Sequence, residues 1–126
     1  MKQVLIIRNS ENVVEIDRVP FEQGTLDYYY KELECSCVDI VHAYGLSIDA
    51  DIIVDDEALL KDKPIINPQA SIAYGVLKHG QLIMGNAIIC KPHFTKNGVD
   101  ETGFEPEELD KILDEINRGM VEVMKL

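Results

Sequence analysis

The stretch from Ile52 to Cys90 constrains the fold most, because it joins apolar, strand-like runs to the densest set of turn-forming residues in the chain. It begins with the apolar segment Ile52–Val54, which is typical of a strand, and continues into the acidic turn Asp55–Glu57. A proline forces extended backbone on the residue before it, and Lys61–Pro68 contains two prolines, Pro64 and Pro68. We therefore expect Lys61–Pro68 to be a surface loop and not a helix.

The second half of this stretch is consistent with more than one local structure. Ser71–Leu77 fits a short helical turn or a strand. The pair Gly85-Asn86 lies between the apolar runs Leu82–Met84 and Ala87–Cys90, as in a tight hairpin. If Leu82–Cys90 is instead one long strand, Gly85 marks a bulge or a close approach of another backbone segment.

The N-terminal segment predicts a β-hairpin. Gln3–Arg8 and Val13–Ile16 are rich in β-branched residues and are separated by a short polar turn. Val4–Ile7 is continuously apolar, which is typical of a central strand covered on both faces.

Two further strands are predicted before the acidic turn. Cys35–Tyr44 is rich in strand-forming residues, and Ile48–Val54 follows after a turn. In the second of these, Asp49 and Asp51 share one side, so we expect a half-solvated strand.

Two main helices are predicted, at Thr25–Glu34 and at Pro106–Arg118. Both carry apolar residues at helical spacing, and Gly119 is typical of a position just after a helix end. Between them, Lys91–Gly103 is expected to be a polar, mobile loop, and Val121–Leu126 an edge strand or a contact with a second copy. Residues 1–126 are therefore predicted to form a single α+β domain with a mostly antiparallel sheet and two main helices.

The charge balance limits the classes of partner. The chain has 12 Lys and Arg against 23 Asp and Glu, a net charge of −11, which opposes direct binding to nucleic acid. No apolar segment approaches the roughly 18 residues of a membrane span, and residues 1–3 do not resemble a signal sequence. We expect a cytoplasmic protein that does not bind membranes, with its three cysteines reduced.

The cysteines and histidines do not form a convincing reactive or metal site. Cys35, Cys37, Cys90 and His93 make a formal set of four zinc ligands, but a single Cys-x-Cys pair is a poor match to structural zinc sites. The chain has no Gly-x-Ser-x-Gly elbow and no glycine-rich phosphate loop. We therefore predict no metal, no cofactor and no catalytic residue. A small enzyme acting through Cys90 and His93 stays an alternative.

A binding function requires only a concave surface with a few convergent polar groups. Polar and basic residues near the turns of the middle and C-terminal parts are candidates, and the basic ones among them suit an anion such as a nucleotide phosphate. The candidate ligand-binding residues are Asn67, Tyr74, Lys78, His79, Asn86, Lys91 and His93.

Several short segments together carry a family resemblance. These are Ile53–Glu57, Leu59-Leu60, Pro64, Asn67, Ala70, Gly80 and Ile83–Cys90. The pattern resembles an uncharacterised family of small domains from phages and conjugative elements of gut and Gram-positive bacteria, often encoded near antirestriction genes. The chain departs from that pattern where Asn67 is followed by Pro68. The resemblance favours the single-strand interpretation of Leu82–Cys90.

The resemblance implies a setting but supplies no reaction and no catalytic residues. It implies a non-enzymatic protein in the cytoplasm of a bacterial host, which counters host defence by sequestering a small, anionic, nucleotide-like ligand as a homo-oligomer. The alternative is an acidic interaction module, or nucleic-acid mimic, that occupies a host defence protein.

Overall fold

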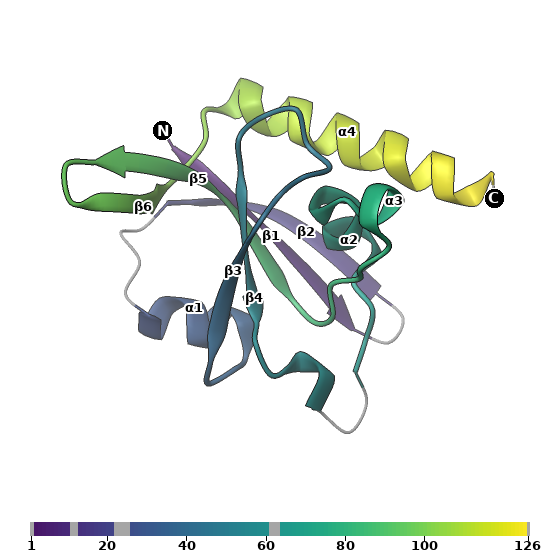
Figure 1. The fold of residues 1–126 in the computed structure, drawn as a ribbon, viewed down its shortest axis with the longest axis horizontal. Helices are drawn as coiled ribbons and strands as arrows, with labels where there is room; N and C mark the ends of the chain where they lie inside the picture. The colour runs from purple at the N-terminus through teal and green to yellow at the C-terminus, as the bar shows by residue number, and fades with distance from the viewer. Residues whose placement is uncertain (1, 11–12, 22–25, 61–63, 126) are drawn as a thin grey trace.

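The structure is a computed structural model of the chain, and it describes residues 2–10, 13–21, 26–60 and 64–125. Within these residues the fold is a single α+β domain in which an antiparallel sheet has helices on both faces (Figure 1), as predicted. The strands are β1 (Gln3–Ser10), β2 (Val13–Pro20), β3 (Val38–His42), β4 (Asp51–Asp55), β5 (Ala87–Thr95) and β6 (Gly98–Thr102). The helices are α1 (Leu26–Leu33), α2 (Pro68–Tyr74), α3 (Val76–His79) and α4 (Pro106–Met124), with a short 3₁₀ turn, η1 (Ala58–Leu60).

The strand order is β2-β1-β5-β4-β3, and β6 pairs with β5. The predicted N-terminal hairpin is confirmed, since β1 pairs with β2 along its whole length, from Gln3 opposite Pro20 to Ser10 opposite Val13. The prediction of a central strand at Val4–Ile7 is also confirmed. These four residues are at most 3% exposed, because β1 lies between β2 and β5.

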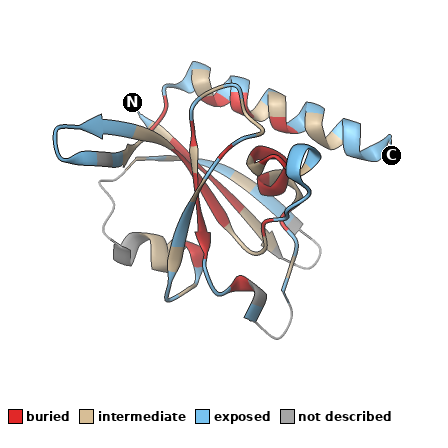
Figure 2. Ribbon diagram, in the orientation of Figure 1, coloured by how far each residue is buried: buried red, intermediate tan, exposed pale blue. Residues whose placement is uncertain are grey.

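Alternation along the strands sends apolar side chains into two cores. Figure 2 shows that the buried residues of the sheet lie in its middle strands. Leu5 and Ile89 face α2 and α4, where Ile112 and Ile116 cover them. On the other face, the core includes Leu33 of α1. Helices on both faces explain why the middle strands contain the continuous apolar runs Val4–Ile7, Ile52–Val54 and Ala87–Cys90.

The prediction that Ile48–Val54 is half-solvated is wrong. The strand begins only at Asp51, and Ile52–Val54 are buried, because β4 lies between β3 and β5 and has a core on each face. The position directly before the strand, Ala50, is also fully buried.

The prediction that Lys91–Gly103 is a polar, mobile loop is also wrong. Strand β5 continues through this segment to Thr95 and pairs with β6, forming a hairpin that projects from the body of the sheet (Figure 1). Gly98, with a φ of 126°, permits the tight turn.

The segment before β5 is neither a tight hairpin nor part of one long strand. Gly85 has a φ of 78°, and β5 begins only at Ala87. Met84 instead forms an isolated bridge with Ile66. The single-strand interpretation of Leu82–Cys90 is therefore wrong.

The Lys61–Pro68 prediction is correct in part. Residues 61–63 lie outside the described residues and Pro64 is exposed, but Asn67 is fully buried and Pro68 opens helix α2. Proline suits a first helical position because no intrahelical partner is lost there. Ser71–Leu77 is accordingly helical, divided between α2 and α3 at Gly75.

The two main predicted helices are present, with shifted ends. Thr25 lies outside the described residues, and α1 ends at Leu33. Helix α4 starts at Pro106 but passes Gly119 and continues to Met124, so no edge strand follows. A Cβ at Gly119 would lie 2.3 Å from Ile72 Cγ2. This glycine therefore permits contact between α4 and α2 and does not end the helix.

Candidate functional site

The structure separates the seven residues predicted to bind a ligand into three groups. One group lies on α2 and α3, one beside the C-terminal end of β1, and one on the β5–β6 hairpin. In the same order, these are Tyr74, Lys78 and His79; Asn67 and Asn86; and Lys91 and His93. Helix α3 and the β5–β6 hairpin lie at opposite ends of the molecule in Figure 1, so the four basic residues do not form one anion site.

Tyr74 and His79 belong to an exposed group of rings that we call the aromatic corner: His42, Tyr44, Tyr74 and His79. The ring centroids of Tyr74 and His79 are 4.5 Å apart, and those of Tyr44 and Tyr74 are 6.3 Å apart. His42 packs edge-on against Tyr44 at 4.8 Å. Tyr44 is 54% exposed, so part of its ring is available for stacking with a ligand.

Two glycines allow the aromatic corner to form. The N–H of Gly45 donates to the carbonyl of Ala73 at 2.9 Å, and a Cβ on Gly45 would lie only 2.1 Å from the Ile72 carbonyl oxygen. Gly75 has a φ of 106°, a left-handed conformation that turns the chain from α2 into α3. The β3–β4 loop can therefore lie directly against α2, which brings Tyr44 beside Tyr74.

Lys78 supplies a cation at the aromatic corner. Its Nζ donates to the Tyr44 carbonyl at 2.8 Å, and an ammonium group has two further N–H donors for an anion. His79 is already engaged on both nitrogens, since Nε2 lies 3.0 Å from the Tyr74 carbonyl and Nδ1 accepts from the Gln81 N–H at 3.1 Å. His79 therefore orients the corner, and Lys78 is the group suited to hold an anion.

A hollow of about 200 Å³ adjoins the corner at Tyr74. We call it the side pocket. Its walls combine apolar side chains with three polar residues, Asp55, Asp56 and Gln81. The other lining residues are Val41, Val54, Ala58, Leu82, Ile83 and Met84.

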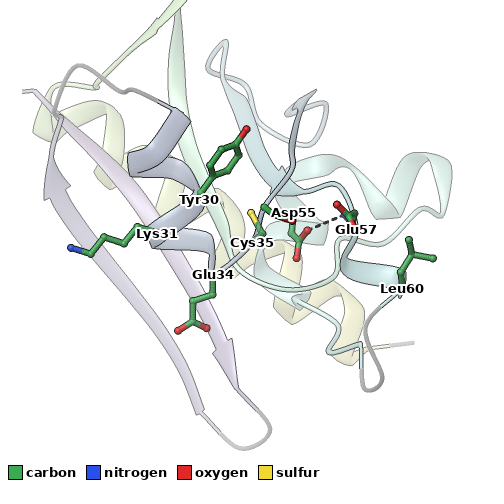
Figure 3. Close-up of a pocket in the computed structure, with 8 residues that line it drawn as sticks. Tyr30, Lys31, Glu34, Cys35, Asp55, Glu57 and Leu60 are labelled. Atoms are coloured by element: carbon green, nitrogen blue, oxygen red, sulfur yellow. Dashed lines mark hydrogen bonds between the residues drawn. The ribbon is translucent and has the colours of Figure 1, made fainter.

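A second hollow, of about 500 Å³, lies between α1 and the end of β4 (Figure 3). We call it the acidic hollow. The Glu57 N–H donates to Asp55 Oδ1 at 2.9 Å, and in Figure 3 the Cys35 thiol lies beside Asp55, whereas Lys31 points away from them. The Glu57 carboxylate raises the pKa of the exposed Cys37 thiol by hydrogen bonding and charge. The lining residues are Tyr30, Lys31, Glu34, Cys35, Ser36, Asp55, Glu57 and Leu60.

The side chains of the two asparagines form hydrogen bonds mainly with backbone groups. Asn67 Oδ1 accepts from the Ala70 N–H at 3.0 Å, capping α2, and Nδ2 donates to the Gly85 carbonyl at 2.8 Å. Asn86 Oδ1 accepts from the Asn9 N–H at 3.0 Å. Asn67 is completely buried, so it stabilises the fold and does not contribute to a binding surface.

The two basic residues of the hairpin lie among acidic ones. Lys91 Nζ pairs with Glu108 Oε2 at 2.9 Å, and this contact lowers the pKa of the Glu108 carboxyl. His93 is opposite Asp100 in the register of β5 and β6. Neither forms a basic patch with Lys78.

Cys90 is a buried thiol that contacts partly exposed carboxylates at the base of the hairpin. Its Sγ donates to Glu101 Oε2 at 3.3 Å, and burial raises the pKa of this thiol well above its ordinary value. Burial and a hydrogen bond with Asp51 raise the pKa of the Glu101 carboxyl to about 8. Cys90 and His93 are three residues apart on one strand and so point to opposite faces. The geometry therefore does not support a Cys90–His93 pair.

The four formal zinc ligands do not meet either. Across the described ranges, no group of three or more His, Cys, Asp and Glu side chains is arranged to hold a metal ion. Cys37 is exposed and Cys90 is buried.

The fold and site together define a small α+β domain with an exposed aromatic corner and an acidic surface. The chain belongs to a family of domains of unknown function, DUF3846, whose model matches residues 1–117. This agrees with the predicted resemblance to an uncharacterised domain family. No curated protein and no solved structure is significantly similar to the chain. In the parts of the chain that the structure describes, no helix is long and apolar enough to cross a membrane.

Of the residues at the corner, the sequence patterns indicated Tyr74, Lys78 and His79 but not Tyr44 or His42. A signal for the corner exists in the sequence: the dipeptide Tyr-Gly occurs twice, at Tyr44-Gly45 and Tyr74-Gly75. A glycine directly after an aromatic residue allows close backbone approach beside the ring. The sequence alone does not show that the two dipeptides meet.

Proposed function

We propose that this protein is a non-enzymatic binding protein that sequesters a small, anionic, nucleotide-like ligand at the aromatic corner. The ligand's ring system packs against the aromatic side chains of the corner, and its phosphate accepts hydrogen bonds from Lys78. Stacking of a base on an aromatic side chain is worth about 1–3 kcal/mol, and a hydrogen bond to a charged group adds about 1.5–3 kcal/mol.

The convergence of rings and a lysine from separate parts of the chain supports this proposal. Tyr44 comes from the β3–β4 loop, Tyr74 from α2 and Lys78 from α3, and a Lys78–Tyr44 hydrogen bond of 2.8 Å joins them. At the contact between the β3–β4 loop and α2, Gly45 has no room for a side chain and Gly75 has a left-handed backbone. An exposed group of rings with a cation among them is suited to a planar, anionic ligand.

The biological setting of the proposal comes from the family resemblance. A phage or mobile element that removes a nucleotide signal from the cytoplasm of its bacterial host would counter a defence that depends on that signal. The proposal includes assembly into a homo-oligomer. Val121 and Met124, which are 51% and 82% exposed near the end of α4, are apolar side chains that a second copy could cover. Light scattering of the purified protein tests this assembly.

The direct test of the proposal is the capture of a ligand from cells. Protein purified from a bacterial host is denatured by heat, and the supernatant is analysed by mass spectrometry for phosphate-bearing small molecules. We expect a nucleotide-like compound from the wild type and its loss from Tyr44→Ala and Lys78→Met. His93→Ala, on the distant hairpin, is the matched control and retains the compound. Release of no such compound by any folded form contradicts the proposal.

The acidic hollow favours a second function, an interaction module that occupies a basic host protein. Glu34, Asp55 and Glu57 are among the residues that line a hollow of about 500 Å³, in a chain of net charge −11. Such a complex forms rapidly at low salt and weakens as ionic strength rises. A salt-sensitive complex that Glu57→Gln weakens, with no bound small molecule, would favour this second function.

A further inference from the structure

Charges of opposite sign lie on the two sides of Tyr74. On the aromatic side, Lys78 Nζ is 2.8 Å from the Tyr44 carbonyl. On the other side, the side pocket carries the carboxylates of Asp55 and Asp56 and the amide of Gln81. The Tyr74 hydroxyl donates towards Gln81 Oε1 at 3.4 Å, so the ring that packs against His79 also lines the side pocket.

This arrangement excludes a phosphate from the side pocket. Two neighbouring carboxylates repel a phosphate. A planar ring meets apolar walls at Val41, Leu82 and Met84. A volume of about 200 Å³ is smaller than the roughly 300–1,000 Å³ of pockets for drug-sized ligands, so it suits one ring system and not a whole nucleotide.

The polar groups of the side pocket also select the edge of the ring. An ionised carboxylate only accepts hydrogen bonds, and the Gln81 amide oxygen is a further acceptor. Asp55 is 6% exposed and accepts the Glu57 N–H, whereas Asp56 is exposed and its carboxylate is accessible to a ligand. A ring that presents an amino group would donate to Asp56, and a ring that presents a carbonyl at the same place would be repelled.

We propose that the ligand is a nucleotide with an amino-bearing base, whose base enters the side pocket beside Tyr74 with its amino group on Asp56 while its phosphate stays outside on Lys78. This inference rests on the proposed function and adds the class of base and its direction in the site. The base then packs against the ring of Tyr74, which lines the side pocket, and Tyr44 contacts the sugar that joins the base to the phosphate.

The test is isothermal titration calorimetry of the full chain with two matched pairs of nucleotides at low salt. Adenosine and inosine monophosphates differ by an amino group or a carbonyl at one ring position, and cytidine and uridine monophosphates differ in the same way. We expect the amino-bearing member of each pair to bind at least about tenfold more tightly, as one hydrogen bond to a charged acceptor implies. Asp56→Asn should remove most of this preference. Glu107→Gln, which makes the same change in net charge on exposed α4, should leave it intact.

The outcomes separate this inference from the function on which it rests. Equal binding within each pair overturns the amino-bearing base and leaves nucleotide capture standing. A preference that Asp56→Asn does not reduce overturns the assignment of Asp56 and the direction of the base. Failure of all four nucleotides to bind, in a folded protein, counts against nucleotide capture itself.

Discussion

The aromatic corner and the acidic hollow lie at opposite ends of the β3–β4 pair, and they differ in how the chain builds them. The corner depends on close backbone contact between the β3–β4 loop and α2, through Gly45 and Gly75. The acidic hollow depends on side chains of α1, β4 and the turn after it, such as Glu34 and Glu57. The corner is therefore sensitive to backbone changes, and the hollow to charge.

The two regions also differ in the ligand that each suits. Rings and a lysine at the corner suit a planar anion, whereas the carboxylates of the hollow suit a cationic side chain of a partner. A chain of net charge −11 repels anions at long range, so a local cation such as Lys78 matters more in this protein than it would in a neutral one.

The largest effect is expected from Gly45→Ala, which tests whether the corner depends on backbone contact. The new Cβ would lie 2.1 Å from the Ile72 carbonyl oxygen, so the β3–β4 loop must move away from α2. We expect the free energy of unfolding to fall by about 2–3 kcal/mol, measured by urea denaturation, and ligand capture to be lost. Gly80→Ala is the control, since a Cβ there has no neighbour within 4 Å, and its left-handed φ should cost only about 1 kcal/mol. An equal loss in the two variants would contradict the close contact.

The next largest effect concerns the carboxyl groups of Asp51 and Glu101. This pair lies beside the aromatic corner, because His42 Nδ1 is 3.7 Å from Asp51 Oδ1. Burial and the hydrogen bond with Asp51 raise the pKa of Glu101 from 4.5 to about 8 in the folded chain, so folding favours the protonated form. The stability that this group contributes is complete below pH 4.5 and is lost as the pH rises through about 8. Glu101 is half exposed, so solvent screening reduces the effect on the free energy of unfolding to about 1–2 kcal/mol.

Urea denaturation between pH 6 and pH 9 measures this dependence. Glu101→Gln cannot ionise and should remove it, whereas Glu107→Gln on α4 should retain it. A wild type whose stability does not decline towards pH 9, or a decline that persists in Glu101→Gln, would contradict a shared proton at this pair.

Local patterns were sufficient to predict much of the fold. The β-branched run at Val4–Ile7 identified the buried central strand, and the spacing of Leu109, Ile112 and Ile116 identified the face of α4 that packs on the sheet. The predicted helix and strand boundaries were wrong where a contact with a distant part of the chain determines the boundary. Gly119 ends no helix, because Ile72, 47 positions earlier in the chain, requires a glycine opposite it.

The candidate site was harder to predict for the same reason. Lys78 and His79 share a short helix, so local sequence grouped them correctly, whereas Tyr44 reaches them only through the β3–β4 loop. The position of Asn67 beside the prolines suggests a surface residue. Its amide instead accepts a hydrogen bond from the Ala70 N–H and donates one to the Gly85 carbonyl. An asparagine that caps a buried helix and one that binds a ligand have the same local sequence signal.

A moderate effect is expected from Lys78→Met, which tests whether the corner and the hollow differ in ligand. Loss of the ammonium group should weaken the binding of adenosine monophosphate about tenfold, because a charge-assisted hydrogen bond is lost. Lys111→Met, on the exposed side of α4, makes the same change in net charge and should alter binding by less than about twofold. Glu57→Gln in the acidic hollow should not weaken it. Equal losses in Lys78→Met and Lys111→Met would indicate a general effect of charge and no specific site.

The smallest effect is expected at the Cys37 thiol, which reports the charge of the acidic hollow. Its pKa is raised chiefly by the hydrogen bond and charge of Glu57, so Glu57→Gln should increase the thiolate fraction at pH 8. We expect alkylation of Cys37 by iodoacetamide to become about twofold to fivefold faster, measured by mass spectrometry of the Cys37 peptide. Cys90, which is 1% exposed, serves as the internal reference because it should stay unmodified in the folded protein. The same substitution should leave nucleotide binding at the corner unchanged, so a variant that alters both would show that the two regions are one site.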